Sequence, residues 1–334
     1  MNELEFRLIN EFQRDFPLAP EPFTLLAHRL ATDEATVLTT LAQLQGEGVV
    51  SRVGAVFAPR RVGASTLAAL PAPLDRLDDI AALISAHPEV NHNYEREHRY
   101  NLWFVVTARD EASLRKTLAE IEAETGCRVL SLPLEDEFYI DLGFSLGHDL
   151  AGISKSPCAS RRIAAEGSRP LSDAEASLMG ALQDGLDLVS RPYARLAQRA
   201  GMTEGEALAL LQQWHNEGVI KRFGVVVRHH ELGYTANAMV VWDMPDALVA
   251  AAGAQLAAEP AVTLCYRRSR HQPEWRYNLY CMIHGRERGE VERSVAVLSQ
   301  RYSLSAYPHA VLFSNRRFKQ RGARYVAVSE TVDG

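Results

Sequence analysis

The stretch LLAHRLATDEATVLTTLAQLQGEGVVSRVGAVFAPRRVG, residues 25–63, decides the fold because the chain contains it twice. At a constant offset of 170 residues it matches RLAQRAGMTEGEALALLQQWHNEGVIKRFGVVVRHHELG, residues 195–233. Self-similarity at a constant offset is the signature of a duplicated architecture. We therefore expect two homologous halves in tandem. The matched residues include Gly48, Arg52, Gly54 and Gly63, which fall on Gly218, Arg222, Gly224 and Gly233.

Each half begins with three segments of helical periodicity and continues into a strand. Thr32 or Asp33 can cap the third helix of the first half, and Gly48 ends it. Thr203 and Gly218 take the same positions in the second half. Three helices followed by a β-hairpin predict a winged helix-turn-helix in each half.

The rest of each half reads strand, helix, strand, strand, helix, strand. This order predicts a ferredoxin-like βαββαβ domain, so the fold class is α+β with a tandem duplication. Apolar residues on both strand faces, such as Trp103 and Phe104, predict that the two sheets contact each other within one chain as a pseudo-dimer. The predicted units are a winged helix-turn-helix at 1–62, a ferredoxin-like domain at 63–147, a linker at 148–170, a second winged helix-turn-helix at 171–232, a second ferredoxin-like domain at 233–326 and a tail at 327–334.

Composition excludes several classes of protein. The chain has 334 residues, 47% of them hydrophobic, with a mean hydropathy of −0.16. It therefore forms a globular protein rather than a membrane protein. The first residues, MNELEFRLINEF, lack the features of a signal peptide, so we expect the cytoplasm. The four cysteines form no C-x-x-C pair, which argues against a structural metal or a disulfide framework.

A winged helix followed by a ferredoxin-like domain resembles the leucine-responsive (Lrp/AsnC) regulators, which implies DNA binding. Recognition helices need cations near the phosphates. Between Leu30 and Ser51, and between Ala200 and Ile220, there is no Lys or Arg, and the net charge is −6. We therefore expect no DNA partner.

Arginine, histidine and aromatic residues gather at matched places in both halves, and only four of the 36 basic residues are lysine. Guanidinium groups pair with carboxylates, and aromatic rings stack on flat molecules. A flat ligand with several carboxylates is a tetrapyrrole. The clusters are His92 to Asn101 and Tyr266 to Asn278 in the hairpins, Arg52, Arg60 and Arg61 and Lys221 to His230 after the third helices, and Arg316, Arg317, Lys319, Arg321 and Arg324 near the end.

Three motifs make the resemblance more specific: Y-x-R-E-H-x-Y-N-L-W-F from Tyr94, R-Y-N-L-Y-C-M-I-H-G from Arg276, and R-R-F-K-Q-R-G-A-R-Y from Arg316. They resemble the siroheme decarboxylases of haem d1 and alternative haem biosynthesis. The resemblance implies a fused form of two homologous subunits that removes both acetate carboxyl groups of siroheme to give 12,18-didecarboxysiroheme. It implies no cofactor besides the iron that siroheme carries. A tetrapyrrole-sensing regulator and a non-catalytic carrier are the alternatives.

Loss of CO₂ from a pyrrole acetate leaves a carbanion-like centre, to which a proton must be delivered. His98 is our first candidate acid, and His229 or His230 is the second; each could instead bind the siroheme iron. His92 is expected to be an ordinary strand histidine, no protein metal site is expected, and the chain can pair again as a homodimer. The candidate catalytic residues are His98, His229, Tyr94 and Arg96; the candidate substrate-binding residues are Arg52, Arg99, Asn101, Arg222, Arg228, Tyr266, Arg267, Arg270, Arg276 and Asn278.

Overall fold

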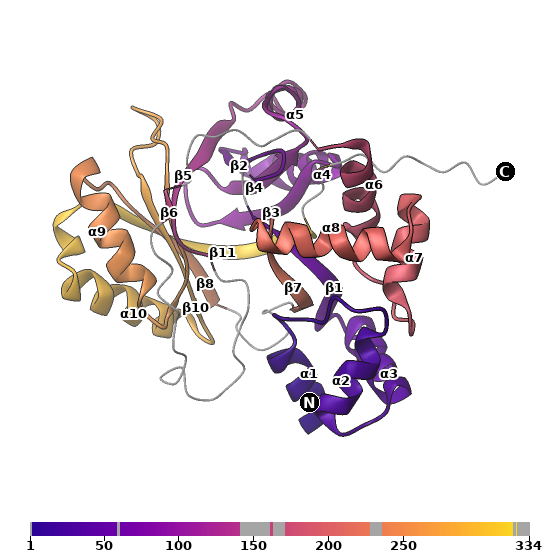
Figure 1. The fold of residues 1–334 in the computed structure, drawn as a ribbon. Helices are drawn as coiled ribbons and strands as arrows, with labels where there is room; N and C mark the ends of the chain where they lie inside the picture. Colours follow the sequence, from indigo (N-terminus) through magenta and orange to yellow (C-terminus); the bar gives the residue numbers. More distant parts are fainter. Residues whose placement is uncertain are drawn as a thin grey trace.

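The computed structural model describes residues 2–58, 61–140, 161–162, 171–227, 236–322 and 325. Two helix-turn-helix units lie beside a large sheet that carries further helices (Figure 1). The helices of the first unit are α1 (Glu3–Glu11), α2 (Pro22–Leu30) and α3 (Glu34–Gly46), and those of the second are α6 (Asp173–Leu182), α7 (Pro192–Ala200) and α8 (Glu204–Asn216).

The third helix of each unit begins and ends where its sequence predicts. The Asp33 side chain accepts a hydrogen bond from the Thr36 amide at 2.8 Å, and Thr203 forms a capping box with Glu206. Gly48 and Gly218 follow the helices with φ angles of 77° and 70°, in the left-handed region that glycine adopts without strain. The predicted caps are therefore confirmed.

The wing differs in one detail from the prediction. Strand β1 (Val50–Phe57) pairs antiparallel with β7 (Ile220–Val227) of the other half, with Gly54 opposite Gly224. Each half thus supplies one strand to a shared two-stranded sheet instead of forming its own hairpin from these residues. The reason is packing, because the two units bury one common apolar core.

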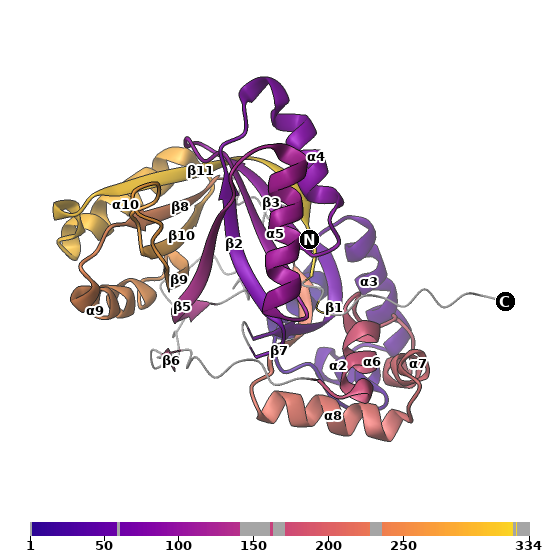
Figure 2. The same cartoon turned by 90° about the horizontal axis from the view of Figure 1, so that it is seen from above.

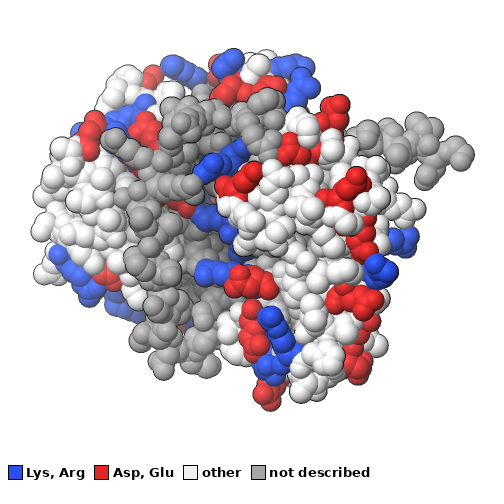
Figure 3. Space-filling view, in the orientation of Figure 1, with Lys and Arg blue, Asp and Glu red and all other residues white. Residues whose placement is uncertain are grey.

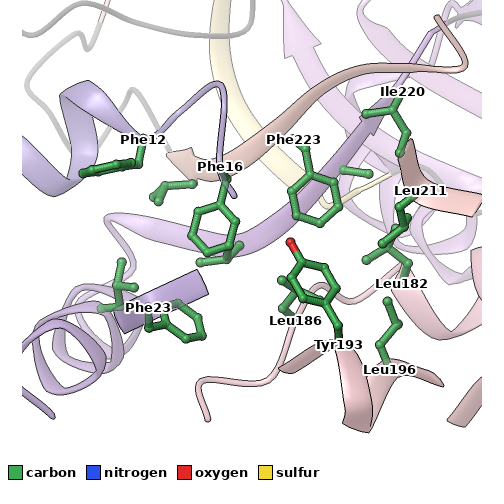
Figure 4. Close-up of a cluster of buried hydrophobic side chains, with 14 of the residues drawn as sticks. Phe12, Phe16, Phe23, Leu182, Leu186, Tyr193, Leu196, Leu211, Ile220 and Phe223 are labelled. Carbon is green, nitrogen blue, oxygen red and sulfur yellow. The ribbon is translucent and has the colours of Figure 1, made fainter. Parts of the chain in front are cut away.

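Aromatic side chains from both halves meet in that core (Figure 4). Phe16 packs edge-on against Phe23 at 5.6 Å and lies 6.1 Å from Phe223 of the second half. The Tyr193 hydroxyl donates a hydrogen bond to the Pro17 carbonyl of the first half at 2.8 Å. The helix-turn-helix units therefore form one body.

The ferredoxin-like order is confirmed in both halves. The first half contains β2 (Ala64–Leu70), α4 (Leu77–Ala86), β3 (Val90–Arg96), β4 (Leu102–Ala108), α5 (Glu111–Thr125) and β5 (Leu130–Ile140). The second contains β8 (Ala236–Trp242), α9 (Asp246–Ala257), β9 (Val262–Arg268), β10 (Leu279–Gly285), α10 (Arg288–Arg301) and β11 (His309–Gln320).

The last strand of each half crosses into the sheet of the other. β11 pairs with β8 up to Phe313 and with β3 from Ser314 onward. β5 pairs with β2 up to Pro133 and with β9 from Leu134 onward. The order β2-β4-β3-β11-β8-β10-β9-β5 then returns to β2, so eight strands close into a ring. Figures 1 and 2 show β11 running from the lobe of α9 and α10 toward that of α4.

The interior of the ring is apolar and draws on both halves. Its members include Trp103, Leu132, Met239, Tyr280 and Leu312. This shared core confirms the predicted contact between the two sheets. Of the predicted linker, only Arg161–Arg162 are described; they form β6 beside β5, and the tail 327–334 lies outside the described residues. None of the described helices is long and apolar enough to cross a membrane.

Candidate active site

Alternation along β3 sorts its side chains onto two faces of the sheet. The Asn93 amide donates to the Ala81 carbonyl of α4 at 3.0 Å, so Asn93 lies on the outer face. Arg96 reaches Met282 of the ring interior. His92, Tyr94 and Arg96 therefore share the inner face.

The crossing of β11 brings the basic end of the chain beside this face. Arg317 lies opposite Tyr94 in the register of the two strands, and Gln320 lies opposite His92. The rings of His92 and Tyr94 are stacked, with centroids 6.3 Å apart and an interplanar angle of 15°. Arg317 is exposed.

Arg52 approaches the same place from β1 of the helix-turn-helix unit. Gly322 makes room for it, because a Cβ there would lie 2.9 Å from the Arg52 Cζ. Arg52 also packs on Gly185 of the second half, whose φ is 97°. We call Arg52, His92, Tyr94 and Arg317 the first-half cluster. Figure 3 shows Lys and Arg side chains in the middle of one face of the molecule and around its edge, with acidic side chains among them.

Burial sets the protonation states in the first-half cluster. Burial, with a further contribution from the Arg52 charge, lowers the pKa of His92 to about 4, so its imidazole is neutral at neutral pH. Burial raises the pKa of Tyr94, although Arg96 and Arg317 act in the opposite direction, so the phenol keeps its proton.

Arg52 offers a hydrogen-bond donor that the described protein leaves unused. One of its terminal nitrogens donates to the Ala55 carbonyl at 3.1 Å. Its buried Nε has no hydrogen-bond partner within the described part of the chain. A buried unpaired donor is costly unless something satisfies it. A carboxylate of a bound ligand can do so.

Arg96, a predicted catalytic residue, has contacts that are structural. Its guanidinium donates to the Leu312 carbonyl of β11 at 3.1 Å. The matched Arg268 donates to the Leu132 carbonyl of β5 at 2.6 Å. Each arginine thus holds the strand that arrives from the other half, which accounts for its repetition without a ligand.

The matched asparagines also serve the fold. The Asn101 side chain accepts from the Ala72 amide and donates to the Ala72 carbonyl, both at 2.8 Å. Asn278 bonds in the same way to the backbone of Met244, at 2.9 and 3.1 Å. Both amide groups are engaged inside the protein, so their contacts do not indicate the substrate-binding role predicted for them.

The arginines of the second hairpin are paired with acids. Arg267 lies 2.7 Å from Glu135 and 3.0 Å from Asp246. Arg270 and Arg276 both contact Asp243, at 3.1 and 2.7 Å. These three predicted substrate-binding residues therefore form an internal ion-pair network.

Tyr266 stacks on Tyr280 at 5.6 Å and lies under Arg268. Arg222 is buried and donates to the Gln13 carbonyl at 3.3 Å.

His98 lies beyond the end of β3 and outside the first-half cluster. It stacks on Tyr100 and meets Trp275 edge-on at 5.3 Å. Its Nδ1 accepts from the Tyr100 amide at 3.1 Å, and burial followed by the Arg99 charge lowers its pKa. Arg99 is exposed at the hairpin. Arg228, His229 and His230 lie outside the described residues.

Sequence reasoning missed two members of the first-half cluster. The sequence predicts an ordinary strand histidine at His92 and places Arg317 only in a basic cluster near the end of the chain. The spacing of His92 two residues before Tyr94 was the available signal, because both then share one face. No signal in the sequence shows that β11 crosses to β3.

Among the described residues, no group of three or more His, Cys, Asp or Glu could hold a metal ion.

Fold and site together define a tandem Lrp/AsnC-like protein with a cationic, aromatic cluster between its helix-turn-helix body and its ring of strands. The AsnC-like ligand binding domain family matches residues 61–139 and 231–319. The siroheme decarboxylase NirDL-like HTH domain family matches residues 5–50 and 175–221.

A siroheme decarboxylase NirDL subunit of Paracoccus denitrificans is 46% identical over 98% of this chain and 99% of its own length. A siroheme decarboxylase NirD subunit of Stutzerimonas stutzeri is 53% identical over 44% of this chain and 97% of its own length. A crystal structure of siroheme decarboxylase NirDL with an iron-uroporphyrin III analogue is 28% identical, with a TM-score of 0.71 over 98% of this chain and 94% of that one. The chain belongs to the siroheme decarboxylase family.

Proposed function

We propose that this chain is a siroheme decarboxylase that converts siroheme to 12,18-didecarboxysiroheme in haem d1 biosynthesis, with the first-half cluster as its site. Full-length identity of 46% to a siroheme decarboxylase supports the reaction. The meeting of Arg52, His92, Tyr94 and Arg317 from three strands of the fold supports the location. The observation that carries the location is the Arg52 guanidinium beside the neutral ring of His92, with a buried Nε that has no hydrogen-bond partner among the described residues.

The reaction breaks the bond between an acetate methylene and its carboxyl carbon. CO₂ leaves, and the electron pair stays on the methylene carbon, where the tetrapyrrole ring delocalises it. A proton then converts the methylene to a methyl group. The protein must therefore hold carboxylates, orient the scissile acetate and deliver one proton.

The first-half cluster contains a group for each task. Arg52 and Arg317 hold carboxylates through charge-assisted hydrogen bonds. Tyr94 keeps its proton at neutral pH because burial raises its pKa, and it is our proton donor to the methylene carbon. The neutral imidazole of His92 is the form that binds metal ions, so we assign it to the iron of siroheme.

We further propose that the enzyme needs no cofactor beyond the iron of its substrate, binds no DNA and works in the cytoplasm. The described parts of helices α3 and α8 carry no Lys or Arg, which supports the absence of DNA binding. His98 stays a candidate acid outside the cluster.

The proposal is tested by anaerobic incubation of the purified chain with siroheme, followed by chromatography and mass measurement of the tetrapyrrole. We expect a product that has lost two CO₂. Tightly bound but unchanged siroheme would overturn the proposed enzymatic activity and would favour a carrier or a tetrapyrrole sensor. Salt-dependent binding to an operator DNA would overturn the expected absence of a DNA partner.

A further inference from the structure

We infer that Cys265 and Cys281 form a modification site, at which a peroxide converts two contacting thiols into a disulfide bond within the chain. Their Sγ atoms lie 3.3 Å apart, and both residues are thiols in the structure. The pair belongs to the second half and lies outside the first-half cluster. Its chemistry therefore does not depend on the proposed function.

The register of the sheet places the two cysteines for such a bond. Cys265 of β9 lies directly opposite Cys281 of β10 in an antiparallel pair. Residues directly opposite each other in such a pair have Cα atoms about 4.5 or about 5.5 Å apart. The Cα atoms of a disulfide usually lie about 4.4–6.8 Å apart. The backbone therefore already meets the requirement, and only the two sulfur atoms have to approach further.

The first half has different residues at this cross-strand position, where Asn93 lies opposite Phe104. The Asn93 amide donates to a carbonyl of α4 at 3.0 Å, and the Cys265 thiol donates to a carbonyl of α9 at 3.5 Å. Cys265 thus keeps the contact of the asparagine with the covering helix. That contact does not account for Cys281, which stands where the first half has a large apolar ring and which brings the second thiol.

Burial decides which oxidants can react with the pair. Both side chains are 0% exposed and lie in the apolar core between the sheet and helices α9 and α10. Bulky or charged oxidants are therefore excluded from the folded chain. Hydrogen peroxide is small and uncharged, and it can enter during brief local openings of the structure. Because the thiolate is the reacting form and the surroundings are apolar, we expect the first step to be slow.

The reaction balances with one peroxide for each pair. The sulfur of either cysteine attacks a peroxide oxygen, the O–O bond breaks, and a sulfenic acid and one water form. The second sulfur then attacks the sulfenic sulfur, so that an S–S bond forms and the second water leaves. Since the two sulfurs are in contact, this second step is intramolecular and outpaces further oxidation to a sulfinic acid.

The bond would tie β9 to β10 on the outer face of the sheet. The next residues along the two strands, Tyr266 and Tyr280, stack on the inner face with ring centroids 5.6 Å apart. The disulfide therefore lies directly behind the aromatic pair of the second half. A thiol reductant reverses it, and disulfides of this kind in a reducing compartment are usually transient.

The test is disulfide mapping of the full chain after exposure to hydrogen peroxide in the folded state. N-ethylmaleimide blocks the remaining thiols before trypsin digestion, and the arginines between residues 267 and 276 place Cys265 and Cys281 in separate peptides. We expect the two peptides to be joined and dithiothreitol to separate them. Cys127→Ala is the matched control and keeps the link. Cys281→Ala loses it and leaves Cys265 to be oxidised to a sulfinic acid.

The inference is overturned if no linked peptide forms at any peroxide concentration at which far-ultraviolet circular dichroism shows a folded chain. A link from either cysteine to Cys127 or Cys158, or conversion of both members of the pair to sulfinic acids, would also overturn it. The unsubstituted chain gives each of these results, so a variant that fails to fold does not affect the decision.

Discussion

Strands β5 and β11 occupy equivalent positions, since each completes the sheet of the other half, yet they differ in charge. β11 brings Arg317 to Tyr94, and β5 brings Glu137 to Tyr266. The features that both halves share, such as Arg96 with Arg268 and Asn101 with Asn278, hold the backbone. The repeated Arg96 and Asn101 therefore belong to the fold, whereas the proposed site combines the repeated Arg52 and Tyr94 with His92 and Arg317, which the second half replaces with Leu264 and Glu137.

The largest expected effect is on catalysis in the first half. Tyr94→Phe removes the proposed proton donor while keeping the ring that stacks on His92. We expect turnover to fall by about a hundredfold or more, the usual contribution of a positioned acid. Single-turnover kinetics with siroheme measure it. Siroheme affinity should stay within about twofold of the unsubstituted chain. A turnover equal to that of the unsubstituted chain would show that Tyr94 does not donate the proton.

The paired glycines of the helix-turn-helix body give a second comparison. A Cβ at Gly224 would lie 2.4 Å from the Phe12 carbonyl oxygen, whereas one at Gly54 would lie 3.2 Å from the Gly185 Cα. We expect Gly224→Ala to lower the free energy of unfolding by about 3 kcal/mol and Gly54→Ala by about 1 kcal/mol or less. Urea unfolding of the two variants checks the order. Equal losses would contradict the packing described between the halves.

His92 makes the stability of the first half sensitive to acid, whereas the equivalent position of the second half is Leu264, which does not titrate. The unfolded chain binds a proton at this histidine as the pH falls through 6.5, but the folded chain does so only near 4. Stability is therefore lost progressively between these values as the pH falls, by up to about 3 kcal/mol. We expect His92→Leu to show a smaller fall in melting temperature between pH 7 and pH 5 than the unsubstituted chain. The same fall in both would show that His92 is not held neutral.

The smallest expected effect concerns the position of Arg52. An added methyl group at Gly322 would lie 2.9 Å from the Arg52 Cζ and would push the guanidinium aside. We expect Gly322→Ala to weaken siroheme binding by about tenfold, with the fold intact. Gly205→Ala in α8 is the matched control, because a Cβ there meets nothing within 4 Å. Siroheme titration gives the dissociation constants of both variants. Equal affinities would show that Arg52 does not bind siroheme.

Much of the fold could be predicted from the sequence, because its signals are local. Asp33 and Thr203 cap the third helices, and Gly48 and Gly218 end them, where the pattern placed them. The order of strands and helices was also readable from periodicity. The pairing of β1 with β7 and the crossing of β5 and β11 could not be predicted, since tertiary packing alone decides which edge a strand joins.

The candidate site was predicted less well for the same reason. Arg52 and Tyr94 were identified from composition and spacing, but Arg317 comes from the far end of the chain through the strand crossing. The repetition of Arg96, Asn101 and Asn278 also predicts a site role, and their side chains form hydrogen bonds to the backbone. The signal for His92 is its spacing two residues before Tyr94, which places both side chains on one face of β3.

The central claim, that the first-half cluster binds siroheme with His92 at its iron, is tested most directly by anaerobic titration of the purified protein with siroheme, followed by visible absorption. We expect an absorption change on binding that is lost in His92→Leu. An unaltered absorption change in His92→Leu would contradict the claim.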